Sequence, residues 1–147
     1  MSSDRPARVA MIDDNPADVL LARLFLRREK LALEVTRHAT GEAFLDAMEN
    51  GQPQPDLALV DLNLPLMRGA DLLRRARGAL WARDVTFGVV SGSSDPADRA
   101  ESLAAGAAFF LSKPITLASI EAICAAAPRF VLVENAGARA LTLRRAG

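Results

Sequence analysis

Short runs of apolar residues alternate along the chain with longer stretches in which apolar residues recur every three or four positions. The apolar runs fall at residues 8–12, 33–36, 57–60, 85–90 and 107–111. Such runs are typical of parallel strands covered on both faces, and the stretches between them are typical of amphipathic helices that cross over from one strand to the next. The pattern therefore predicts an α/β fold in which strands and helices alternate.

Polar residues mark where several of the predicted helices begin. Asn15 precedes Pro16, and Asp95 precedes Pro96, so each polar side chain can cap a helix whose first turn tolerates proline. Thr40 opens a shorter helix in the same way. In the first of these helices four apolar residues recur at helical spacing, and we expect them to pack on the sheet: Leu20, Leu21, Leu24 and Phe25.

The predicted strands and helices are complete by about residue 127. We therefore expect residues 1–127 to form one domain and residues 128–147 to be an extension. Apolar runs at 130–133 and 140–143 flank the turn-prone residues 135–137, a pattern that indicates a hairpin. Two strands alone are marginal in water, so such an arm needs another surface, and a homodimer is one hypothesis. A frayed basic tail is the alternative.

Composition restricts the function more than it reveals it. The chain has 147 residues, half of them hydrophobic, and its 18 basic and 18 acidic residues cancel, so no overall charge attracts it to nucleic acid or to a membrane. The single cysteine excludes an internal disulfide. No apolar run reaches membrane-spanning length, and the start of the chain lacks the core of a signal peptide. We expect a soluble cytoplasmic protein whose charges act locally, without direct binding to nucleic acid or membrane.

Polar side chains follow directly on several predicted strands. These residues are Asp13, Asp14, Asp61, Ser91 and Lys113. Because the carboxyl ends of parallel strands meet at one edge of an open sheet, we expect the five side chains to lie close together there.

Each residue type in this set has a chemical use. Neighbouring carboxylates attract Mg²⁺, which prefers oxygen ligands, and their mutual repulsion should raise the pKa of at least one of them until a cation binds. A carboxylate can also attack phosphorus to give an acyl phosphate, and Asp61, at the end of the most apolar strand, is the candidate nucleophile. Lys113 and Ser91 can bind phosphate oxygens through charge and through a hydrogen bond.

Four motifs in this order resemble those of response-regulator receiver domains: DD at 13–14, DLNLPLMRG at 61–69, SG at 91–92 and KP at 113–114. The match covers about residues 7–127. The segment DDNPAD at 13–18 further resembles single-domain regulators paired with bacteriophytochrome-type sensor kinases. The resemblance implies a flavodoxin-like, doubly wound five-stranded parallel sheet of (βα)5 type. It also implies a Mg²⁺ cofactor held by Asp13, Asp14, Asp61 and the backbone carbonyl of Asn63.

The function implied by the resemblance is that of a two-component phosphorelay. Asp61 would receive a phosphoryl group from a phosphohistidine on a sensor histidine kinase or a histidine phosphotransfer protein. The group would be lost by slow self-catalysed hydrolysis, so the chain would be a phosphoacceptor and not an enzyme. Ser91 and Phe110 match the residues that move when such domains switch and change the face presented to a downstream protein target. Phe110 lacks the hydroxyl of the commoner tyrosine, so the switch is a separate expectation from the phosphorylation.

Two other functions agree with part of the pattern. A phosphatase or phosphotransferase with an aspartyl-phosphate intermediate also places a nucleophilic aspartate beside Mg²⁺. The haloacid-dehalogenase-like enzymes of this kind have a second acid two residues after the nucleophile, where this chain has Asn63, which cannot serve as acid or base. A phosphorylation-independent interaction module would keep the receiver fold without the chemistry, and its usual mark is a missing acid, serine or lysine.

Overall fold

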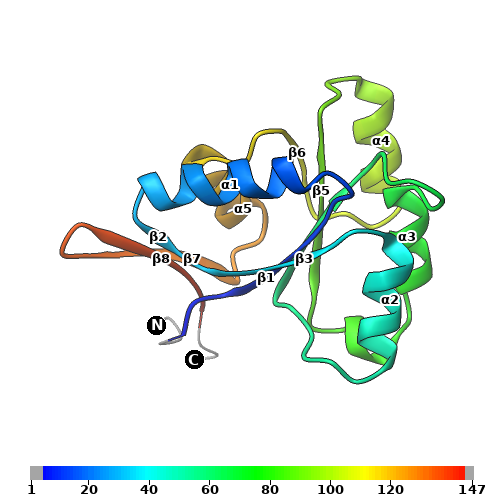
Figure 1. Ribbon diagram of the computed structural model, residues 1–147, viewed down its shortest axis with the longest axis horizontal. Helices are drawn as coiled ribbons and strands as arrows, with labels where there is room; N and C mark the ends of the chain where they lie inside the picture. Colours follow the sequence, from blue (N-terminus) through cyan, green and yellow to red (C-terminus); the bar gives the residue numbers. More distant parts are fainter. Residues whose placement is uncertain (1–4, 145–147) are drawn as a thin grey trace.

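The central element of the computed structural model, which describes residues 5–144, is a five-stranded parallel sheet (Figure 1). Its strands are β1 (Arg8–Ile12), β3 (Glu34–His38), β4 (Leu57–Asp61), β5 (Thr86–Ser91) and β6 (Phe110–Ser112). Their spatial order is β3-β1-β4-β5-β6, and each neighbouring pair is parallel. The order reverses between β1 and β4, as in flavodoxin-like sheets, and confirms the predicted fold class.

Helices cover both faces of this sheet (Figure 1). One face carries α1 (Pro16–Arg28) and α5 (Leu117–Ala126). The other face carries α2 (Gly41–Glu49), α3 (Gly69–Ala76), the short 3-10 helix η1 (Leu80–Ala82) and α4 (Pro96–Ala104). Because both faces are covered, all five residues of β4 are buried, as the continuous apolar run before Asp61 predicts.

The predicted helix caps are present. Asn15 Oδ1 accepts a hydrogen bond from the Ala17 amide at 3.0 Å, and Asp95 Oδ1 accepts one from the Ala97 amide at 2.9 Å. The side chain of Thr40 caps α2 in the same way. Each cap satisfies a backbone N–H that the helix itself leaves without a partner, which explains why these helices begin where the sequence indicates.

The buried side of α1 is not the predicted one. Val19, Ala22 and Leu26 face the core and are at most 3% exposed. The expectation for the leucines was wrong, because Leu20 and Leu24 are 57% and 48% exposed and Leu21 is also exposed. Helix α1 carries apolar residues on almost all sides, so their spacing alone does not identify the face that packs.

A glycine in β5 makes room for an aromatic side chain that comes from the residue just before β6. A Cβ added at Gly88 would lie 2.1 Å from two ring carbons of Phe109, which is far inside van der Waals contact. Phe109 is only 6% exposed and belongs to the core on the α1 and α5 face. Gly88 therefore allows the large Phe109 ring to pack flat against β5.

The extension forms the expected hairpin and folds back on its own chain. Strand β7 (Phe130–Asn135) pairs antiparallel with β8 (Ala138–Leu143), and β8 also pairs with the short β2 (Leu31–Ala32). Phe130 and Leu141 are 1% and 0% exposed within the main core, so the frayed-tail alternative is wrong for this segment. The surface that a two-stranded hairpin needs to pack against is therefore supplied by its own chain. Residues 1–4 and 145–147 of the two predicted segments lie outside the described residues.

Within the described part of the chain, no helix has both the length and the apolarity needed to cross a bilayer.

Candidate functional site

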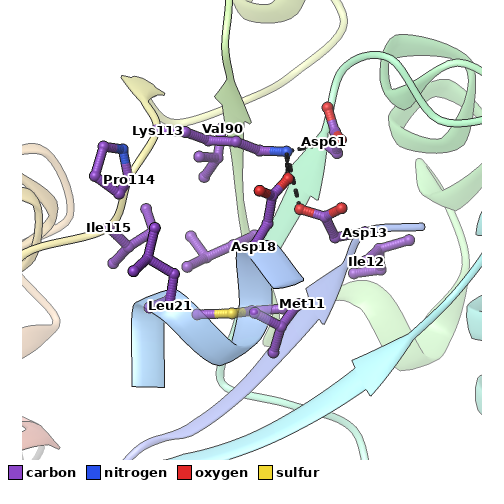
Figure 2. A pocket seen from close by; sticks show the side chains of 13 residues that line it. Met11, Ile12, Asp13, Asp18, Leu21, Asp61, Val90, Lys113, Pro114 and Ile115 are labelled. Carbon is purple, nitrogen blue, oxygen red and sulfur yellow. Dashed lines mark hydrogen bonds and ion pairs between the residues drawn. The ribbon is translucent and has the colours of Figure 1, made fainter. Parts of the chain in front are cut away.

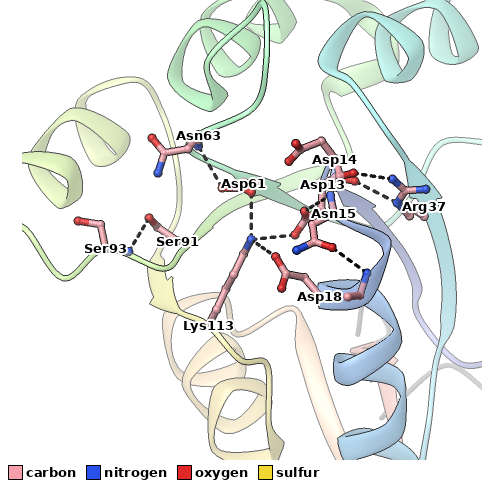
Figure 3. A network of polar contacts seen from close by, with 11 residues as sticks. Asp13, Asp14, Asn15, Asp18, Arg37, Asp61, Asn63, Ser91, Ser93 and Lys113 are labelled. Atoms are coloured by element: carbon pink, nitrogen blue, oxygen red, sulfur yellow. Dashed lines mark hydrogen bonds and ion pairs between the residues drawn. The ribbon is translucent and has the colours of Figure 1, made fainter.

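The ammonium group of Lys113 lies among three carboxylates at the carboxyl edge of the sheet (Figure 3). Its Nζ is 2.9 Å from Asp13 Oδ2, 3.0 Å from Asp61 Oδ2 and 2.7 Å from Asp18 Oδ2. Asp13 follows β1, Asp61 ends β4 and Lys113 follows β6, so the predicted meeting of these strand ends is observed. Asp18 comes instead from the first turn of α1.

The second oxygen of each strand-end carboxylate is bound by the loop that follows its own strand. The Asn15 amide donates to Asp13 Oδ1 at 2.9 Å, and the Asn63 amide donates to Asp61 Oδ1 at 3.0 Å. The chain after Asp61 turns back closely, since a Cβ added at Gly69 would lie 2.5 Å from the Asp61 carbonyl oxygen. Both carboxylates are therefore oriented by backbone N–H groups before any ligand binds.

Burial and the neighbouring charges alter two pKa values at the site. Burial works against the charged form of Lys113, but hydrogen bonds to Asp18, Asp13 and Asp61 outweigh it and raise the pKa of the ammonium group well above its ordinary value. Burial also raises the pKa of Asp13, against the opposing effect of the Asn15 amide and Lys113. The predicted rise in an acid pKa is thus found, although its main cause is burial and the repulsion from Asp61 contributes least.

The donors at this edge suit a hard divalent cation. Asp13, Asp18 and Asp61 each offer a carboxylate oxygen within 4.8 Å of the other two, and Mg²⁺ binds oxygen ligands of this kind. Asp14 lies apart from this group: it is exposed, and its backbone carbonyl accepts a hydrogen bond from Arg37. The larger ligand set inferred from the sequence, which includes Asp14 and the Asn63 carbonyl, stays a prediction.

Ser91 is the last residue of β5, and Phe110 is the first residue of the adjacent strand β6. Ser91 is fully buried, its Oγ accepts a hydrogen bond from the Ser93 amide at 3.1 Å, and its carbonyl accepts one from the Lys113 amide at 2.9 Å. Phe110 is half-buried and packs on the cluster that contains Leu62 and Val89. The Ser91 hydroxyl is therefore engaged with its own loop in this structure, and the switching roles of Ser91 and Phe110 stay predictions.

A pocket of about 250 Å³ opens beside the charged cluster (Figure 2). Asp13, Asp18, Asp61 and Lys113 line its polar end, and apolar side chains that include Leu21 and Ile115 line the rest. Pro114, which follows Lys113 through a cis peptide bond, forms part of the wall. One of the exposed leucines of α1, Leu21, thus lies at the edge of the pocket that contains Asp61.

Sequence reasoning missed Asp18 and Arg37 as members of this site. A signal for Asp18 was present, because a helix that starts directly after β1 places its first turn beside the same sheet edge. Arg37 acts through backbone carbonyls, and residue type and spacing do not predict such contacts.

The fold and the charged site define a receiver domain. Residues 9–125 match the family described as "Response regulator receiver domain", and the chain belongs to this family. Family membership places the chain in two-component signalling.

Curated relatives agree with this assignment. The chain is 32% identical over 120 residues to "Two-component response regulator ORR41" from Oryza sativa subsp. japonica, a match that covers 80% of this chain and 91% of the rice protein. It is 34% identical over 106 residues to "Transcriptional regulatory protein KdpE" from Mycobacterium tuberculosis, with 72% of this chain covered. The match spans only 44% of KdpE, so the activity of that whole protein is not transferred here.

Solved structures show the same fold. The bacteriophytochrome response regulator AtBRR aligns with a TM-score of 0.75 at 23% identity, over 89% of this chain and 99% of that one. The chemotaxis response regulator CheY4 of Vibrio cholerae aligns with a TM-score of 0.68 at 21% identity, over 83% and 99% of the two chains.

Proposed function

We propose that this chain is a phosphorylation switch that receives a phosphoryl group on Asp61. The observation that carries the proposal is the convergence of Asp61, Asp13 and Lys113 at the carboxyl edge of a receiver-domain sheet. A phosphorylation-independent interaction module would not need this arrangement, because a partly buried lysine ammonium that faces acids adds a desolvation cost without serving a binding surface.

The proposed donor is a phosphohistidine on a sensor histidine kinase or a histidine phosphotransfer protein. A carboxylate oxygen of Asp61 attacks phosphorus, a new O–P bond forms, the P–N bond breaks, and the imidazole nitrogen keeps the electron pair of that bond. In the later hydrolysis a water oxygen attacks phosphorus, the O–P bond to Asp61 breaks, and inorganic phosphate leaves. The Asn63 amide and Lys113 orient the two Asp61 oxygens, and Lys113 is placed to balance the charge of the phosphoryl oxygens.

Asp13 and Asp61, with Asp14 and the Asn63 carbonyl, are the proposed holders of Mg²⁺. When bound there, the cation would neutralise the carboxylates and the phosphoryl oxygens, which otherwise repel each other. Asp18 remains beside Lys113 as the carboxylate outside this set, at the shortest of the three distances. We assign it the role of holding the ammonium group in place.

The phosphodonor protein is proposed to dock on the exposed side of α1. Leu20, Leu21 and Leu24 leave apolar surface in water, and Leu21 lines the same pocket as Asp61. Leu21 borders the pocket that contains Asp61, so a protein that presents its histidine there would cover these leucines. Burial of exposed apolar surface of this kind stabilises protein complexes.

The proposed output is a change of the face around Phe110. Ser91 would turn from the Ser93 amide toward the phosphoryl group, and Phe110 would change its packing on the cluster around Leu62. A downstream protein target would then distinguish the two states of this face.

The proposal is tested with purified protein, Mg²⁺ and acetyl phosphate, followed by intact mass measurement. We expect one added phosphoryl group in the wild type and in Asp71→Asn, which changes an exposed aspartate of α3 that pairs with Arg74. We expect no adduct in Asp61→Asn or without Mg²⁺. An adduct that persists in Asp61→Asn would move the acceptor elsewhere. Absence of any adduct in folded wild-type protein that binds Mg²⁺ would favour the interaction module.

A further inference from the structure

The side chain of Arg37, in β3, reaches the loop that carries the acid pair (Figure 3). Its Nε donates to the backbone carbonyl of Asp13 at 3.0 Å, and its Nη2 donates to the carbonyl of Asp14, also at 3.0 Å. One planar guanidinium group thus binds two consecutive carbonyl groups at the point where β1 ends. A lysine has no comparable pair of parallel donors.

The same loop is held to β3 through a second bond. The Asp13 amide donates to the His38 carbonyl at 3.0 Å, so the N–H and the C=O of Asp13 are both bound by neighbouring residues of one strand. The Asp13 carboxylate extends from this fixed backbone to the Asn15 amide and to Lys113. A shift of the Asp13 backbone would therefore move its carboxylate away from Asp61.

The guanidinium group does not form an ion pair with the acids around it. Among residues 5–144, none of the salt bridges involves Arg37, although Asp13 and Asp14 are its direct neighbours in space. Its hydrogen bonds go to carbonyl oxygens. This choice of partner indicates a role in the conformation of the loop and not in the neutralisation of its carboxylates.

We propose that Arg37 is a positioning residue. It holds the loop that begins at Asp13 and Asp14, here called the acid loop, in the conformation needed to bind Mg²⁺ and accept the phosphoryl group. The proposal rests on the function proposed above for Asp61. In this role Arg37 would orient residues that bind the metal without touching the metal itself. Substitution of such orienting residues commonly weakens metal binding.

Positioning and charge predict opposite effects of removing Arg37. If only its positive charge mattered, Arg37→Met would make the site more negative and strengthen Mg²⁺ binding. If its two hydrogen bonds hold the loop, Arg37→Met weakens Mg²⁺ binding, and Arg37→Lys, which keeps the charge, weakens it as well. The sign of the change and the behaviour of the lysine variant therefore distinguish the two roles.

Arg23 offers a matched control. It is an exposed arginine of α1 whose Nη2 donates to the Val35 carbonyl at 3.0 Å, two residues before Arg37 on the same strand. Arg23→Met removes a similar side-chain contact to β3 without touching the acid loop. Loss of a surface arginine in general is thereby separated from loss of the contacts of Arg37.

Two measurements test the proposal: Mg²⁺ titration by isothermal calorimetry, and amide hydrogen exchange of metal-free protein read by mass spectrometry. We expect Arg37→Met and Arg37→Lys to weaken Mg²⁺ binding about tenfold or more. We expect Arg23→Met to match the wild type. Without metal, peptides that span residues 13–18 should exchange faster in both Arg37 variants and not in Arg23→Met.

The two measurements distinguish failure of the positioning role of Arg37 from failure of the function proposed for Asp61. Tighter Mg²⁺ binding by Arg37→Met, or wild-type behaviour of Arg37→Lys in both measurements, would overturn the positioning role. If the wild type itself binds no Mg²⁺, the function proposed for Asp61 fails, and the metal-free exchange of residues 13–18 still decides whether Arg37 holds the loop. Unchanged exchange there in Arg37→Met would overturn the proposal.

Discussion

Two aspartates lie at the two ends of β4, one in the charged site and one in a structural ion pair. Asp61 ends the strand in the charged site, whereas Asp56 precedes it at the other edge of the sheet and is 8% exposed. The Arg5 guanidinium binds both oxygens of Asp56 at 2.9 and 3.2 Å, and the Arg8 amide donates to Oδ2 at 2.8 Å. Burial acts to raise the pKa of Asp56, but these hydrogen bonds outweigh it and lower the pKa below its ordinary value.

This lowered pKa makes the contribution of Asp56 to stability depend on pH. The ionised form is favoured in the folded state, so the contribution is complete above the unfolded pKa of about 3.9 and is lost as the pH falls through the lower folded pKa. We expect Asp56→Asn to lower the free energy of unfolding by about 1–2 kcal/mol at pH 7, because the neutral amide binds Arg5 more weakly. Urea unfolding at pH 7 and near pH 3 measures both values, and the difference between wild type and variant should shrink at the lower pH.

The control for this prediction is Asp71→Asn, whose partner Arg74 and own side chain are both more than half exposed. An exposed pair of this kind contributes little, so its loss should leave the unfolding free energy nearly unchanged at either pH. A wild-type advantage over Asp56→Asn that stays constant down to pH 3 would contradict the role given to the ionised carboxylate.

At the level of single residues, sequence patterns predict which side chains lie together when the strand topology alone brings them together. Asp13, Asp61 and Lys113 are found together because parallel strands end at one edge, and that follows from the order of the motifs. Asp18 and Arg37 were not predicted, since their contacts depend on how a helix turn and a long side chain are oriented. The same limit applies to Ser91, whose position follows from β5 while the direction of its hydroxyl does not.

Helix α1 shows a corresponding limit at the level of elements. The strands and helix starts follow from apolar runs and caps and are found within a few residues of the predicted bounds. The face that α1 buries was predicted wrongly, because the small Ala22 packs against the sheet between Val19 and Leu26 while larger leucines stay outside. Hydrophobicity alone ranks Leu above Ala for burial, although close packing of a helix on a sheet favours the small residue.

The exposed leucines of α1 allow a test of the docking surface proposed for the phosphodonor protein. We expect the double variant Leu20→Ser and Leu24→Ser to be as stable as the wild type, because both side chains are about half exposed or more. Its phosphorylation by acetyl phosphate should be unchanged, since neither leucine lines the pocket around Asp61. Phosphotransfer from a histidine kinase that phosphorylates the wild type should be slowed about tenfold, as expected when a partner loses apolar contacts. Radiolabelled transfer and intact mass measure the two reactions.

Leu80 provides the matched control for a lost surface leucine. It is 80% exposed in η1 and lies outside the residues that line the pocket of the site. Leu80→Ser should leave both reactions unchanged. Equal slowing by Leu80→Ser, or slowing of the acetyl phosphate reaction in the α1 variant, would remove the case for docking on α1.

On the scale of the whole molecule, the extension connects parts of the chain that are distant in sequence. The Ala7 amide donates to the Leu141 carbonyl at 2.7 Å, and the Arg139 amide donates to the Lys30 carbonyl at 2.9 Å. The Arg139 guanidinium also donates to the Glu29 carbonyl at 2.7 Å, at the end of α1. The hairpin therefore joins the start of the chain to the helix proposed to bind the phosphodonor.

This arrangement predicts that the hairpin unfolds together with the sheet as one cooperative unit. Leu141 is fully buried in the core that also contains Ile123, so Leu141→Ala should lower the free energy of unfolding by about 2–5 kcal/mol. Leu143→Ala, two residues further along β8 and only half-buried, should cost less. Urea unfolding of both variants at several protein concentrations measures these values. It also tests the hypothesis of a homodimer, because the unfolding midpoint of a dimer rises with protein concentration. A negligible cost for Leu141→Ala would separate the hairpin from the cooperative unit, whereas a concentration-independent midpoint would count against the homodimer and leave the hairpin as support for α1 within one chain.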